Sequence, residues 1–190
     1  MALMTQPTTS HLELPPHYRA LYRLFLRFAV VMLVFGGLAG VLFQELTSSV
    51  TYAQLAPGVR LEAFYHLALL HGHGFLIGTV MPLCWIVALN TALRLGAPPA
   101  SAGALRWIIW TYLPGAISIL GLITYKGLHY VQCIKGGETD FAAIHAGILG
   151  GNRLLRGIVY GLSHTVATVG LIIFAVVIWR GLNRSSERGT

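Results

Sequence analysis

The stretch that decides the fold is Phe64–Leu93, which reads FYHLALLHGHGFLIGTVMPLCWIVALNTAL. It contains no Asp, Glu, Lys or Arg. A helix needs about 20 mostly apolar residues to cross the hydrocarbon core of a membrane. We therefore predict that this stretch spans a membrane, with a kink at Pro82 that neighbouring helices must accommodate.

Three further segments have the same character, at residues 24–43, 107–131 and 155–179. Of the whole chain, 55% is hydrophobic and only 10% is charged, whereas a soluble domain carries roughly 25% charged residues. So few charges cannot cover a surface that faces water. The sequence predicts an all-α integral membrane four-helix bundle whose main partner is the lipid bilayer.

The basic residues predict which way the bundle is oriented. Cytoplasmic loops carry an excess of Lys and Arg. Eight basic residues would lie on the side of both termini and five on the other side, where acidic residues dilute them. We expect both termini in the cytoplasm, with polar tails at 1–20 and 183–190 around a transmembrane domain at 21–182, in a bacterial inner membrane. Because the basic residues flank the spans, the net charge of +7 does not indicate a nucleic-acid partner.

The connection between spans three and four carries turn chemistry. Thr139-Asp140 is typical of a helix N-cap, and it precedes Phe141–Leu149, which we expect to form a short helix on the outer surface. Gly150-Gly151 would end that helix. No cleavable signal peptide is expected, because the first apolar run is long enough to remain a span.

Six of the eight histidines gather toward the outer face once the chain is threaded through a bilayer. Ionisable residues within spans are costly and indicate function by default, and neutral imidazole is the commonest metal ligand. The alternative is that each ring bonds a neighbouring backbone carbonyl. The six are His66, His71, His73, His129, His145 and His164.

Two spans carry a histidine and two glycines on one helical face, since residues three, four and seven apart share a face. Glycine lets a flat group approach the backbone, so this pattern predicts a heme b between two axial imidazoles. The alternative is close helix packing through small residues. The two sets are His71, Gly74 and Gly78 in span two, and Gly157, Gly161 and His164 in span four.

Other residues suggest secondary roles around this site. Lys126 and Arg156 lie where heme propionates would project, although ordinary anchoring at the interface is the alternative. His66 and His73 share a face seven residues apart. With His129 they predict a second site, for copper or zinc or for a second heme.

The motifs also resemble known families. Gly36-Gly-Leu-Ala-Gly40, followed by Tyr65-His-Leu-Ala-Leu-Leu-His71-Gly and by Met81-Pro82, is similar to the first two helices of heme–copper oxidase subunit I. That resemblance implies a low-spin heme ligand at His71. The His71-Gly-His73 spacing also resembles a later helix of those enzymes, so the division of roles between the two stays open. The remaining helices of subunit I are missing, so oxygen reduction and proton pumping are not implied.

Over residues 28–180 the chain resembles a small family of four-helix membrane proteins without an assigned activity. The shared motifs are His71-Gly-His73, Lys126-Gly127 and Gly161-Leu-Ser-His164. This resemblance bears on the topology and implies no reaction.

Three functions follow as expectations. The first is one-electron transfer by a b-type heme protein, with quinol or a redox protein as its partner. The second is a non-catalytic subunit of a larger respiratory or oxidase-type membrane complex. The third is a copper or zinc site at the outer face. Whether the protein is an enzyme stays open.

Overall fold

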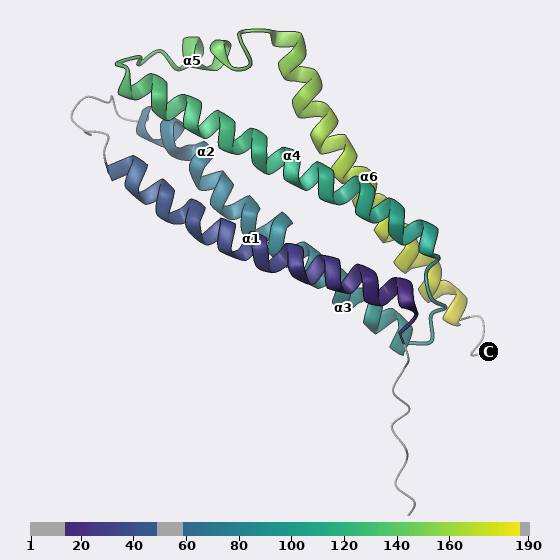
Figure 1. Cartoon of the computed structure of the whole chain (residues 1–190). Coiled ribbons are helices and arrows are strands. Elements are labelled where there is room, and N and C mark those ends of the chain that lie inside the picture. Colours follow the sequence, from purple (N-terminus) through teal and green to yellow (C-terminus); the bar gives the residue numbers. More distant parts are fainter. Residues whose placement is uncertain (1–13, 49–58, 187–190) are drawn as a thin grey trace, which may run out of the picture.

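The computed structural model describes residues 14–48 and 59–186, and these residues are almost entirely helical (Figure 1). The chain forms α1 (Pro16–Ser48), α2 (Val59–His73), the π-helix η2 (Gly74–Val80), α3 (Met81–Arg94), α4 (Ala102–Lys135), α5 (Phe141–Gly147) and α6 (Arg153–Ser186). Helices α2, η2 and α3 follow one another without a break and form the second span.

Four helices are long and apolar enough to cross a membrane, at Pro16–Leu46, Phe64–Arg94, Ala102–Lys135 and Arg153–Arg184. This confirms the all-α prediction and the four apolar spans. Large apolar side chains lie on the exposed faces, with Val30 at 60% and Val34 at 57% exposure. Such faces suit lipid, which agrees with membrane integration.

The helices are longer than the predicted spans. Helix α4 has 34 residues and is therefore about 51 Å long, against about 30 Å of hydrocarbon. Helix α1 begins at Pro16, within the predicted tail 1–20, because proline is well suited to the first helical position. Helix α6 runs to Ser186, into the predicted tail 183–190. Residues 1–13 and 187–190 of these tails lie outside the described part.

Both ends of the helical domain lie at one end of the bundle, which we call the termini end; α5 lies at the opposite end, the α5 end (Figure 1). The largest buried cluster lies on the termini side. Its members come from the first three spans, with side chains of α6 packed against them. They are Tyr18, Leu21, Phe25, Trp85, Leu89, Leu105, Ile108, Tyr112 and Ala116.

The π-helix comes directly before Pro82, the predicted kink. At its end, the Met81 N–H bonds the Leu76 carbonyl, five residues earlier. The next such bond would join residue 82 to Ile77, but proline has no N–H. The Tyr112 hydroxyl of α4 donates to the Ile77 carbonyl instead, at 2.5 Å. A neighbouring helix thus satisfies the carbonyl that proline leaves without a donor.

Helices α4 and α6 approach closely through small residues. A Cβ added to Gly115 would lie 2.5 Å from the Ala167 backbone nitrogen, and one added to Gly170 would lie 2.9 Å from Tyr112. Only glycine permits this approach. Helix α6 packs mainly along α4, while α2 packs on α1 and α4.

The short helix between spans three and four is confirmed as α5, with Asp140 as its N-cap. The Asp140 carboxylate accepts from the N–H groups of Ala142 at 2.8 Å and Ala143 at 3.2 Å. The helix ends at Gly147, two residues before Leu149. Gly150 and Gly151 then turn the chain with φ angles of 67° and 78°, as their sequence indicated.

Candidate functional site

His71 faces helix α1. Its Nδ1 lies 2.8 Å from the Gly36 carbonyl oxygen, and its ring makes an edge contact with Phe75. A Cβ on Gly40 would lie 2.8 Å from the same nitrogen. The glycines of α1 therefore make the space that the His71 ring occupies.

The glycines that share the His71 face are covered by α1. A Cβ on Gly74 would lie 3.2 Å from the Gly36 Cα, and one on Gly78 would lie 2.6 Å from Met32. Both residues are buried. In span two the glycine face therefore serves helix packing, which was the alternative to clearance for a porphyrin.

The corresponding face of α6 is open. An added Cβ on Gly157 or Gly161 would meet no atom within 4 Å, and His164 is exposed. His164 Nδ1 lies 2.8 Å from the Tyr160 carbonyl oxygen, four residues earlier. His71 and His164 lie on different helices, α2 and α6, which both pack against α4.

The hydrogen bonds fix the tautomer of three histidines. A carbonyl oxygen only accepts, so the Nδ1 of His71, His73 and His164 must carry the proton. The Nε2 of each neutral ring then keeps its lone pair. This is the state in which imidazole binds a metal, with its other nitrogen anchored to a carbonyl.

The proposed second metal trio is not assembled. His73 bonds its own helix at Leu69, whereas His129 Nε2 lies 3.2 Å from the Ile144 carbonyl oxygen in α5. Within residues 14–46 and 64–184, no group of three His, Cys, Asp or Glu side chains is placed to hold a metal ion. The copper or zinc site stays a prediction without geometric support.

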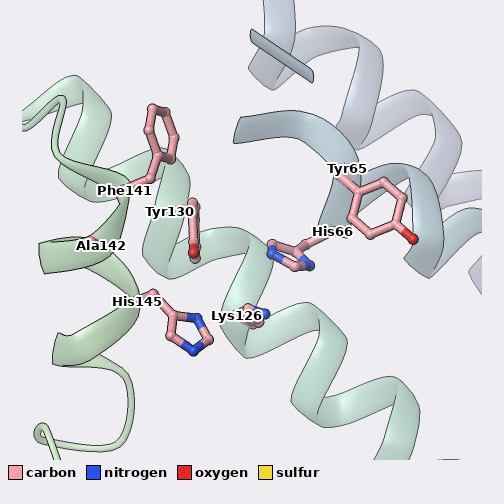
Figure 2. A pocket seen from close by; sticks show the side chains of 7 residues that line it. All are labelled: Tyr65, His66, Lys126, Tyr130, Phe141, Ala142 and His145. Atoms are coloured by element: carbon pink, nitrogen blue, oxygen red, sulfur yellow. The ribbon is translucent and has the colours of Figure 1, made fainter. Parts of the chain in front are cut away.

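A pocket of about 520 Å³ opens instead at the α5 end, between α2, α4 and α5 (Figure 2). His66 of α2 packs against the Tyr130 ring, with ring centroids 5.0 Å apart. Lys126 Nζ lies 5.9 Å from the centroid of the same ring. His145 approaches from α5. The full lining is Tyr65, His66, Lys126, Tyr130, Phe141, Ala142 and His145.

Arg156 holds α5 beside this pocket. Its guanidinium donates to the carbonyls of His145 at 2.7 Å and Ala146 at 3.4 Å. Partial burial, together with the charges of Lys126 and Arg156, lowers the pKa of His145 below its usual value of 6.5. His145 is therefore neutral at pH 7.

Only part of this pocket could be predicted from the sequence. It placed His66, Lys126 and His145 near one end, because each lies close to the end of a span or in the same connection. It grouped His66 with His73 and His129 and not with Lys126 and His145, since helical spacing cannot show which element docks across from a face. A signal in the sequence is the group of tyrosines near these helix ends, Tyr65, Tyr125 and Tyr130, a residue type that is enriched at membrane interfaces.

The described residues thus form an all-α protein with four helices long and apolar enough to cross a membrane and one short capped helix. A model of a family described as "Protein of unknown function (DUF2871)" matches residues 22–181. The chain belongs to that family. No curated protein and no solved structure matches it, so no heme–copper oxidase relationship is shown.

Proposed function

We propose that this protein is a membrane-bound b-type heme protein for one-electron transfer, with His71 and His164 as axial ligands. The observation that supports it is the shared state of the two rings. Each sits within a span, donates from Nδ1 to a backbone carbonyl at 2.8 Å, and keeps a lone pair on Nε2. Bound heme would supply the redox chemistry, while the protein supplies ligands and a low dielectric.

The two imidazoles are suitable axial ligands for heme, but there is open space for a porphyrin beside only one of them. The open face of Gly157 and Gly161 leaves room beside His164, whereas α1 covers Gly74 and Gly78. Room on the His71 side must therefore come from elsewhere around the ring. Lys126 lines the pocket at the α5 end, and Arg156 donates to carbonyls of α5. Neither residue is therefore assigned to the heme propionates, and the proposed heme contacts are the two axial histidines.

The proposal places the termini end in the cytoplasm and the heme nearer the outer face of a bacterial inner membrane. It rests on the distribution of Lys and Arg along the sequence. Reporter fusions at the C-terminus test it: a fluorescent protein that folds in the cytoplasm should fluoresce, and alkaline phosphatase should be inactive. The reverse pattern would overturn the orientation.

The heme itself is tested by the optical spectrum of the detergent-purified protein, oxidised and reduced by dithionite, with a pyridine hemochrome assay. We expect a sharp low-spin b-type spectrum that is lost in His71→Ala and in His164→Ala. His129→Ala is the matched control and should keep the spectrum, because its ring bonds α5 through Nε2. A well-folded protein without pigment would refute the proposal.

A second candidate is a non-catalytic subunit of a larger membrane complex. The exposed face of α6 favours it, because Gly157 and Gly161 are open there and Leu154 and Leu162 are 74% and 61% exposed. Such a face suits a helix of another subunit. Purification from native membranes in mild detergent, without pigment but always with the same other subunits in fixed ratio, would establish this function in place of the first.

A further inference from the structure

The pocket at the α5 end is lined by a half-buried cation, Lys126, and by two histidines. Among the side chains of residues 14–46 and 64–184, no Asp or Glu forms an ion pair with Lys126 or Arg156. The two cations are close enough to interact electrostatically. Like charges held together raise the free energy of this site, and a bound anion would lower it.

The depth of the pocket matches the headgroup region of a bilayer. Helix α4 exceeds the hydrocarbon thickness by about 20 Å, or about 10 Å at each end if it is centred. Lys126 precedes the last residue of α4, Lys135, by nine residues, which is about 13 Å along the axis. A side chain as long as lysine reaches the interface from there.

We propose that this pocket binds a phosphate group, with Lys126 as the cationic contact and the aromatic walls against the rest of the ligand. Lysine commonly binds phosphate as a point charge, and basic pockets between membrane helices bind anionic lipid headgroups. The phosphate comes from an anionic lipid or from a free phosphate compound. The site is separate from the proposed axial ligands His71 and His164.

Protonation of His145 would add a positive charge to the site. His145 lines the pocket with Lys126, His66 and Tyr130, and Arg156 donates to the His145 carbonyl. A bound phosphate offsets the charges of Lys126 and Arg156, so His145 gains a proton more easily when the site is filled. Because a phosphate monoester itself gains a proton at about pH 6, the wild type is compared with His145→Gln: as the pH falls from 7.5 to 5.5, affinity should fall less in the wild type than in the variant.

The test measures binding of dioctanoyl phosphatidic acid, dioctanoyl phosphatidylcholine and inorganic phosphate to the full-length protein in detergent. We expect phosphatidic acid to bind, and Lys126→Ala to weaken it by about tenfold. Lys135→Ala is the matched control, since Lys135 is exposed at the end of the same helix, and it should change the affinity less than twofold. Binding of phosphatidic acid alone identifies a lipid ligand, and binding of inorganic phosphate as well identifies a free anion.

Lys126→Gln keeps the test decisive if Lys126→Ala does not fold. It keeps a polar side chain and removes the charge, so the affinity should still fall several-fold. The proposal fails if the Lys126 and Lys135 variants weaken binding equally, or if phosphatidylcholine binds as well as phosphatidic acid. It also fails if Lys126→Gln binds like the wild type.

Discussion

The bond from the Tyr112 hydroxyl to the Ile77 carbonyl should matter only because residue 82 is proline. Tyr112 is 2% exposed and Ile77 is half-buried, so Tyr112→Phe leaves a half-buried carbonyl without this donor. In membrane proteins such bonds contribute about 0.6 kcal/mol on average and at most about 1.7. Because no water or backbone N–H replaces this donor, we expect the substitution to cost about 1 kcal/mol.

Pro82→Ala restores an N–H that can reach Ile77 in the π-helical pattern or Gly78 in the α-helical pattern. In either pattern the second span regains a backbone donor. Tyr112→Phe should then cost close to nothing, and the double-mutant cycle should give a coupling free energy of about 1 kcal/mol. Equal costs of Tyr112→Phe in the two backgrounds would refute this account.

The assay is unfolding by sodium dodecyl sulfate in mixed micelles, followed by tryptophan fluorescence, since Trp85 contacts Tyr112 with ring centroids 4.4 Å apart. The matched control is Tyr22→Phe. The Tyr22 hydroxyl is buried and has no hydrogen-bond partner among residues 14–48 and 59–186, so its removal should leave stability unchanged or slightly higher. A loss as large as that of Tyr112→Phe would show that the assay reports ring packing and not the hydrogen bond.

Three further outcomes are expected from other parts of the molecule. Gly115→Val should cost about 1–3 kcal/mol of stability, because a Cβ at Gly115 already meets the backbone of Ala167. Gly37→Val should be tolerated, since no described atom lies within 4 Å of a Cβ added there. The same unfolding assay compares the two variants. Asp140→Ala should cost about 1 kcal/mol of local stability, seen as faster amide exchange in α5 with unchanged exchange elsewhere. The pKa of His145 is lowered in the folded protein, so the folded state favours the neutral ring. This contribution to stability is full above the unfolded pKa of about 6.5 and is lost as the pH falls below that value. The unfolding midpoint should therefore fall less steeply between pH 7.5 and 5.5 in His145→Gln than in the wild type.

Hydropathy and turn chemistry predicted the elements of this fold well. An uncharged apolar stretch of about 20 residues or more has few stable conformations other than a spanning helix, and an aspartate before Phe141 with glycines after it marks a short helix. These signals are local, so they can be interpreted without knowing which other helices pack against the segment. The helix ends were less predictable, because a helix continues past the hydrocarbon wherever no breaker stops it.

The contacts between helices could not be predicted in the same way. Periodicity showed that His71, Gly74 and Gly78 share a face, but it did not show that α1 would cover that face. The π-helix depends on a proline and on a tyrosine of another span, so no single segment encodes it. The pocket around Lys126 likewise needs α2, α4 and α5 to be docked together.

The placement of the main buried cluster near the termini end has a consequence for motion. The α5 end is held by smaller clusters, one of which joins Tyr130 to Ile144 and Ile148. Local opening should therefore start at α5 and propagate only part of the way along the helices, leaving the tightly packed half intact. The termini end would then stay folded while the α5 end opens and closes. Amide hydrogens of each long helix should exchange slowly in the half near the termini end and faster in the half near the α5 end.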